Sequence, residues 1–209
     1  MLEPMTAQPY HHGSLRAALL DSAEQAVARS GSDQLSLREI ARLAGVSHGA
    51  PRAHFPTKEA LLDAVAQRGF ERLQARLSVA ANGPAETFIA RVHAVSASYV
   101  DFALENGPLL ELMFSAGRAR RTPALVRAES RAYAVFSDML LEGQRQGLLL
   151  DGIPDDIGLP FFAAIHGIAV LLSSGTLPVQ EKDHIVHNAS SVALRGIRST
   201  GSRAGKRQP

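Results

Sequence analysis

The sequence contains no cysteine and no tryptophan, and aromatic residues make up only 5% of it. Without cysteine the chain can form no disulfide, no thiolate metal site and no cysteine nucleophile, which suits a reducing compartment. The longest apolar run, Ile165–Leu172, is interrupted by His166 and Gly167 and is shorter than the roughly 18 residues of a membrane span. The first residues have neither the basic region nor the apolar core of a signal peptide. We therefore expect a cytoplasmic protein that does not enter a membrane.

The composition of the 209-residue chain is that of a globular protein. Hydrophobic residues make up 45% and charged residues 20%, a balance that excludes wholesale disorder. The formal net charge is only +2, and this value neither requires nor forbids a nucleic-acid partner. Alanine, leucine and arginine are frequent and runs of β-branched residues are few, so the composition favours helices.

Apolar residues recur at helical spacing along most of the chain, in segments separated by glycine, proline and asparagine. This pattern predicts an all-α protein. We expect a flexible arm at residues 1–13, a helical domain at 14–80, a second helical domain at 84–198 and a disordered basic tail at 199–209. The boundary between the two domains falls at Asn82-Gly83-Pro84.

Several of these segments begin with a serine or threonine, the residue types that most often cap a helix. The expected N-caps are Ser14, Ser36, Ser47, Thr57 and Thr122. The segment from Ile157 to Leu172 is apolar on most sides, so we expect this helix to be buried.

Residues 36–55, SLREIARLAGVSHGAPRAHF, have the pattern of a helix-turn-helix. Ser36 and Glu39 have the spacing of a capping box, and Gly45 can adopt the positive φ that the turn needs. Ala41 is small enough for two helices to cross closely. The second helix is expected to run from Ser47 to about His54 and to enter the major groove of DNA.

The position of each polar side chain in this pattern suggests a role at DNA. His48, Gly49, Ala50 and Arg52 lie at the start of the second helix, where base edges are read. Arg38, Thr57 and Lys58 lie near helix N-termini, where a phosphate is favoured. Ser47 and His54 complete the expected DNA-binding set, His54 through packing or a backbone contact. The alternative is a helical corner without a role at DNA.

These motifs resemble the TetR/AcrR family of bacterial transcriptional regulators. The resemblance covers roughly residues 14–62 and rests on Leu20, Ala23, Leu37, Ile40, Ala41, Ala44-Gly45-Val46-Ser47, Gly49, His54-Phe55, Lys58-Glu59 and Leu61. Further along, Ile165-His166-Gly167-Ile168-Ala169 resembles the His-Gly core of the WHG-type C-terminal domain in one branch of the family, as do His11-His12-Gly13 and Ser47-His48-Gly49-Ala50-Pro51. Phe162 stands where that branch has its tryptophan.

The resemblance implies a homodimer with an N-terminal three-helix DNA-binding domain and a C-terminal helical domain that binds an inducer and dimerises. It places the dimer interface on the last two helices, Ile157–Leu172 and Ile185–Ile197. Arg52 stands where the family has a tyrosine that contacts the DNA backbone. Arg52 can make the same phosphate contact or read a guanine with its planar guanidinium.

The aromatic residues of the second domain predict an apolar pocket, because few charges accompany them. The candidate lining residues are Phe102, Phe114, Phe136, Phe162 and His166. Two roles are open for His166. It can be a core histidine whose hydrogen bonds are satisfied, or it can contact the ligand, since the resemblance places it beside a pocket. His184 and His187 have a metal-like spacing but lack a third ligand, so we expect no metal site and no cofactor.

The sequence therefore predicts a ligand-responsive regulator, a repressor that a small molecule releases from a palindromic double-stranded DNA operator. No nucleophile elbow, phosphate-binding glycine loop or His-Glu-x-x-His motif points to an enzyme. The alternative function is a helical small-molecule-binding or interaction protein whose helix-turn-helix no longer binds DNA. Salt-dependent binding to a palindrome separates the two functions.

Overall fold

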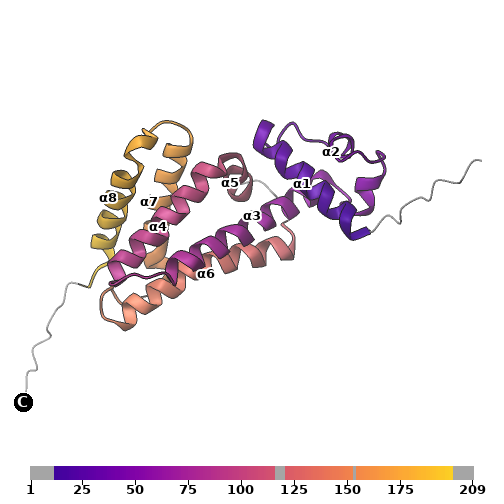
Figure 1. Cartoon of the computed structure of the whole chain (residues 1–209). Helices are drawn as coiled ribbons and strands as arrows, with labels where there is room; N and C mark the ends of the chain where they lie inside the picture. Colours follow the sequence, from indigo (N-terminus) through magenta and orange to yellow (C-terminus); the bar gives the residue numbers. More distant parts are fainter. Residues whose placement is uncertain (1–11, 116–120, 153, 200–209) are drawn as a thin grey trace, which may run out of the picture. The chain divides into compact units, whose positions relative to one another are not determined.

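The computed structural model describes residues 12–115, 121–152 and 154–199, and in these residues the protein is all-α (Figure 1). The predictions for residues 1–11 of the arm and for the tail from residue 200 lie outside the described residues. The first half of the chain forms α1 (His12–Ser30), α2 (Leu37–Leu43), the 3-10 helix η1 (Ala50–Ala53) and α3 (Lys58–Ala81). The second half forms α4 (Phe88–Glu105), α5 (Gly107–Phe114), α6 (Pro123–Arg145), α7 (Pro154–Ser173), the 3-10 helix η2 (Val179–Glu181) and α8 (Lys182–Ile197).

The chain divides into two compact units. Unit 1 contains the described residues up to Arg68 together with those from Pro108 to Leu125. Unit 2 contains residues 69–107 and the described residues from Val126 onward. The division falls inside α3, which itself ends at Ala81, directly before the Asn82-Gly83-Pro84 segment.

Serine and threonine side chains cap helices at three of the five predicted positions. The Ser36 hydroxyl accepts a hydrogen bond from the backbone N–H of Glu39 at 3.2 Å, and the Thr57 hydroxyl accepts one from Ala60 at 3.1 Å. The Thr122 hydroxyl likewise accepts the backbone N–H of Leu125 at 3.3 Å and begins α6. The prediction for Ser14 is wrong, because α1 begins at His12 and Ser14 lies within it. Apolar periodicity locates the buried face of a helix but not its first residue.

The core of unit 1 joins α1 to α2, and the two helices contact each other. Ile40 and Ala41 of α2 are fully buried, as are Leu19 and Val27 of α1. The backbone turns after α2 at Gly45, whose φ of 68° confirms the left-handed conformation expected there. A larger side chain in place of the fully buried Ala41 would have to displace its neighbours in this core.

The core of unit 2 lies among α4, α7 and α8, each of which contacts the other two (Figure 1). On α4 the buried stripe includes Phe88, Val92, Val95, Tyr99 and Phe102, which follow one another at helical spacing. On α7 the buried stripe consists of Phe161, Ile165, Ala169 and Leu172.

The expectation that α7 is buried on most sides is wrong. Leu159 is 65% exposed, and Val170 and Leu171 are also exposed. The described residues of unit 2 bury one stripe of α7 fully and leave the other apolar residues of this helix half-buried or exposed. Residues 156–173 are long and apolar enough for a membrane span, with mean hydropathy 1.7, which corrects the sequence estimate. Length and hydropathy alone are weak grounds for a span, because a helix of a soluble bundle passes the same test.

Close packing at Gly143 generates a stability prediction. A Cβ atom built at Gly143 would lie 2.6 Å from the Phe88 ring and 2.7 Å from Leu149, and both of these side chains are buried. We expect Gly143→Ala to lower the free energy of unfolding by about 1–3 kcal/mol, because overpacking outweighs the better helix propensity of alanine. Urea unfolding followed by circular dichroism measures this change.

Gly107→Ala is the matched control, since its Cβ would meet Ser173 at an ordinary 3.9 Å. The control should change the free energy of unfolding by less than about 0.5 kcal/mol. Equal stabilities of the two variants would show that α6 does not pack this closely.

Candidate functional site

The predicted recognition helix is a single 3-10 turn, so the expectation of a helix capped at Ser47 is wrong. The helix η1 covers only Ala50–Ala53, and its N-cap is Gly49, without a side-chain cap. The backbone N–H of Ala50 donates to the Ser47 carbonyl at 3.0 Å, and that of Arg52 donates to the Gly49 carbonyl at 3.3 Å. Ser47, His48 and Gly49 consequently precede the helix instead of forming its first turn.

Pro51 explains the short helix. In an α-helix capped at Ser47, the first intrahelical hydrogen bond would run from the N–H of residue 51 to the Ser47 carbonyl. Proline has no N–H, so this bond cannot form and the segment winds through bonds between residues three apart. Pro51 is also buried, which holds it in this place.

Contacts at both ends fix the position of η1 in unit 1. In the turn before it, the backbone N–H of Val46 donates to the Ala41 carbonyl at 3.0 Å. At its end the backbone N–H of Phe55 donates to the Pro51 carbonyl at 2.7 Å, and the Phe55 ring is buried. The guanidinium of Arg16 lies 5.0 Å from the centre of that ring. The turn that carries Arg52 is therefore held by α1 and α2.

The predicted DNA-binding residues all lie in unit 1, on α2, η1, the turns beside η1 and the start of α3. Those that are exposed are Arg38, Ser47, His48, Gly49, Arg52 and Thr57. Those that are half-buried are Ala50, His54 and Lys58.

Lys58 has a structural contact that the sequence does not reveal. Its Nζ donates to the backbone carbonyl of Asp33 at 2.8 Å and so joins the start of α3 to the loop before α2. A phosphate at Lys58 would share the ammonium group with this carbonyl.

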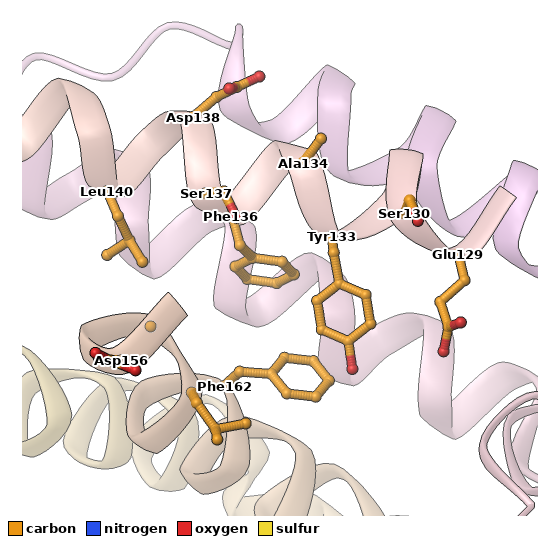
Figure 2. Close-up of a pocket in the computed structure, with 12 residues that line it drawn as sticks. Glu129, Ser130, Tyr133, Ala134, Phe136, Ser137, Asp138, Leu140, Asp156 and Phe162 are labelled. Carbon is orange, nitrogen blue, oxygen red and sulfur yellow. The ribbon is translucent and has the colours of Figure 1, made fainter. Parts of the chain in front are cut away.

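A cavity of about 620 Å³ lies in unit 2 between α6 and α7 (Figure 2). The residues lining it are Glu129, Ser130, Tyr133, Ala134, Phe136, Ser137, Asp138, Leu140, Asp156, Gly158, Leu159 and Phe162. Figure 2 shows Tyr133 and Phe136 projecting from α6 toward α7, where Phe162 lies. A Cβ on Gly158 would lie 2.6 Å from Leu140, so glycine allows the two helices to approach at that end.

Only part of the predicted pocket set lines this cavity. Phe136 and Phe162 do so, together with Tyr133, which the sequence analysis did not select. Phe102 is buried on α4, and Phe114 belongs to unit 1. His166 is half-buried and does not line the cavity, but its ring stacks on Phe162 with centroids 5.6 Å apart.

His166 and Tyr99 form a hydrogen-bonded pair in the core of unit 2. The Tyr99 hydroxyl and Nδ1 of His166 are 2.7 Å apart. Burial lowers the pKa of His166, which favours the neutral imidazole, and burial also raises the pKa of Tyr99, which keeps its hydroxyl protonated. With the imidazole proton on Nε2, Tyr99 donates and Nδ1 accepts. This bond supports the interpretation of His166 as a satisfied core histidine.

An apolar groove of about 800 Å³ runs along α7 and α8 on another face of unit 2. Pro160, Phe161, Ala164 and Ile168 line it from α7. Residues from α8 line the opposite wall: His184, Ile185, Asn188, Ala189, Val192, Ala193, Gly196 and Ile197.

The histidines of α8 have partners other than a metal. His184 Nε2 lies 2.9 Å from the Asn188 side-chain nitrogen, and the His187 ring stacks on His93 with centroids 4.3 Å apart. Within the described residues, no group of three or more His, Asp or Glu side chains could hold a metal ion.

Two family models match the chain. Residues 19–65 match the family described as bacterial regulatory proteins, tetR family, and residues 92–189 match the Tetracyclin repressor-like C-terminal domain. These families contain transcription regulators and not enzymes. The matches do not identify the His-Gly branch, which stays a prediction. No curated protein is similar enough in sequence to count as a match.

Solved structures match nearly the whole chain. A protein of unknown function from Rhodococcus sp. RHA1 is 41% identical, with TM-score 0.80, and the match covers 91% of this chain and 99% of that one. A TetR family protein from Vibrio parahaemolyticus is 21% identical, with TM-score 0.68 and coverage of 88% and 98%. A TetR family transcription regulator from Marinobacter aquaeolei is 21% identical, with TM-score 0.70 and coverage of 90% and 97%.

The half-buried imidazoles of His93 and His166 predict a pH dependence of stability. Burial lowers the pKa of His166 and of His93 in the folded chain, so the unfolded chain binds more protons below the ordinary histidine pKa of about 6.5. The free energy of unfolding should therefore fall as the pH falls from about 7 to about 5. His166→Asn keeps an acceptor for Tyr99 and removes the titrating group, so this fall should become smaller.

Urea unfolding of both proteins at fixed concentration across this pH range measures the difference. Between about pH 7.5 and pH 9, where histidine does not titrate, the two curves should run parallel. An unchanged slope below pH 7 would show that protonation of His166 is not penalised in the fold.

Proposed function

Because the chain belongs to the TetR family of transcriptional regulators, we propose that it is a homodimeric repressor that a small molecule releases from a palindromic DNA operator. The observation that carries the DNA-binding part is the helix-turn-helix of unit 1, with His48 and Arg52 exposed beside and on η1. A protein with this role acts in the cytoplasm, where the bacterial chromosome lies. Release by a small molecule, and repression rather than activation of transcription, are parts of the proposal.

The exposed polar groups of unit 1 divide between base and phosphate contacts. His48 and Arg52 carry side chains that can bond to base edges, and Arg52 can also contact a phosphate. Gly49 and Ala50 contribute close approach and a methyl contact. Arg38, Thr57 and Lys58 lie at the starts of α2 and α3, where exposed backbone N–H groups favour an anion. Phosphate contacts fix the orientation, while base contacts supply specificity.

The exposed apolar surface of α7 and α8 supports a dimer. The groove along these helices is lined mainly by aliphatic side chains, among them Ile168, Ile185 and Val192. Contiguous apolar surface of this kind is characteristic of a protein interface. A symmetric dimer would engage two half-sites about 34–36 Å apart, or a multiple of that distance.

A hydrogen bond to a buried carboxylate offers a route from ligand to DNA. The backbone N–H of Thr122, at the start of α6, donates to the Asp63 carboxylate at 2.7 Å, and Asp63 is only 2% exposed. Asp63 lies on α3, which begins directly after the helix-turn-helix, and later turns of α6 line the cavity. A ligand that shifts α6 would thereby act on α3 and favour a conformer that does not fit the operator.

The alternative function is a helical small-molecule-binding or interaction protein without DNA binding. The short η1 and the bond between Lys58 and Asp33 favour it, because both depart from a long recognition helix with a free phosphate-binding lysine. The DNA measurements below separate the two functions.

We predict that three alanine variants affect DNA binding differently. Lys58→Ala should weaken binding to a promoter palindrome and to a random duplex alike and reduce the salt slope by about one. His48→Ala should reduce the preference for the palindrome, at about 1–3 kcal/mol for the lost base contact. If Arg52 contacts a phosphate, Arg52→Ala should weaken binding to both duplexes, as Lys58→Ala does. If Arg52 reads a guanine, Arg52→Ala should reduce the preference for the palindrome, as His48→Ala does. Fluorescence anisotropy at several salt concentrations measures these affinities.

Arg145→Ala, which removes an exposed arginine from the end of α6, serves as the control and should change neither affinity. Lys58→Arg, which keeps the charge and donors, separates a lost phosphate contact from the loss of the bond to Asp33. If none of the three alanine variants changes binding to either duplex, the chain does not bind DNA through this element.

We also predict that Ile168→Asp dissociates the dimer. Ile168 lines the α7–α8 groove, and a carboxylate there would be buried without a partner at the interface, at a cost of several kcal/mol. Sedimentation velocity of the variant should show monomers at concentrations where the wild-type chain is a dimer. Val79→Asp changes a side chain that is 75% exposed on α3 and should stay dimeric. A dimeric Ile168→Asp variant would place the interface elsewhere.

A further inference from the structure

The cavity between α6 and α7 combines aromatic walls with charge of one sign. Its twelve described lining residues include three carboxylates, Glu129, Asp138 and Asp156, and no lysine, arginine or histidine. The aromatic side chains among them are Tyr133, Phe136 and Phe162. Carboxylates around an apolar cavity oppose an anion and favour a cation, so the lining itself discriminates between ligand classes.

The carboxylates stand at different places around the aromatic rings. Figure 2 shows Asp156 toward the end where Leu140 lies and Glu129 at the other end, beyond Tyr133. Asp138 also lines the cavity, but its carboxylate turns toward the far side of α6. A cation between the two ends would therefore have a carboxylate on either side.

The aromatic side chains form a connected cluster around Phe162. The Tyr133 and Phe162 rings meet edge to face with centroids 4.9 Å apart and an interplanar angle of 62°. Phe136 and Phe162 meet in the same way at 5.9 Å and 68°. Phe162 also stacks on His166, with ring centroids 5.6 Å apart. Ring faces attract an organic cation through their quadrupole, and the ring bodies bury its apolar part.

We propose that this cavity binds an organic cation with an aromatic or bulky apolar body, such as an arylalkyl quaternary ammonium compound. The cavity volume of about 620 Å³ is in the range of drug-sized ligands. A bare metal ion does not fit the site, because most of its wall is apolar and metal cations need several oxygen or nitrogen ligands. The role of this cation as the releasing effector rests on the proposed function, whereas its binding does not.

Two probes that share a ring and differ in charge test the proposal. Isothermal titration calorimetry of the full chain compares naphthylmethyl-trimethylammonium with naphthylacetate. We expect the cation to bind about tenfold or more tightly than the anion, and its affinity to fall as salt is added. Asp156→Asn should weaken the cation about two- to fivefold and leave the anion unchanged or slightly stronger. Asp183→Asn, which removes an acid on α8 whose side chain is 92% exposed and lies 3.3 Å from Lys182 Nζ, should change neither affinity.

A second variant tests the aromatic wall. Tyr133→Leu keeps an apolar side chain of similar reach and removes a ring face, so it should weaken the cation by about two- to fivefold while the Asp156 effect persists. Thermal unfolding of each variant shows that the chain is folded. If a variant does not fold, the wild-type chain alone tests the proposal. It must bind the cation more tightly than the anion, and its affinity for the cation must fall as salt is added.

The outcomes also separate this proposal from the regulator function. Equal or tighter binding of naphthylacetate, no binding of the cation below about 1 mM, or an unchanged affinity in Asp156→Asn overturns the proposal. Operator binding, measured by anisotropy on the same samples, is independent of these results. A chain that binds operator but not the cation keeps the regulator function and loses the cation site. A chain that binds the cation but no DNA keeps the site and loses the proposed function.

Discussion

The hydrogen bond between the Thr122 backbone N–H and the Asp63 carboxylate is the contact on which the proposed regulation depends. A carboxylate that is 2% exposed is stable only when its hydrogen-bonding capacity is used, so the start of α6 is held firmly against α3. Helix α3 follows the DNA-binding element directly, while α6 continues along the cavity. This bond and the ion pair between Arg131 of α6 and Glu71 of α3, at 3.7 Å, join the two helices that connect the two activities proposed for this chain.

The surface of α7 has three parts with different surroundings. One stripe, with Ile165 and Ala169, is buried against α4 and α8. Phe162 and Leu159 line the cavity beside α6, and Pro160 and Ile168 line the groove that we assign to the dimer. Because the core, the cavity and the groove all involve the same helix, a ligand in the cavity lies within one helical turn of residues at the proposed interface. Ligand binding and subunit arrangement are therefore expected to be coupled.

Much of the fold could be predicted from the sequence because its signals are local. The caps at Ser36, Thr57 and Thr122 and the positive φ at Gly45 depend on residues a few positions apart. The 3-10 form of η1 is also a local effect, because Pro51 lacks the N–H that an α-helix capped at Ser47 would need. The apolar pattern of the segment does not reveal this effect. The exposure of α7 and the contact of His166 with Tyr99 depend on which helices pack together, which apolar periodicity does not specify.

Binding of the purified chain to DNA at increasing salt tests the central claim most directly. A palindrome from the chain's own promoter region is compared with a scrambled duplex of equal length and composition. For a sequence-specific regulator, log affinity falls linearly with log salt for both duplexes, and the palindrome binds at least about a thousandfold more tightly. Equal affinity for the two duplexes, or no binding at low salt, would contradict the account.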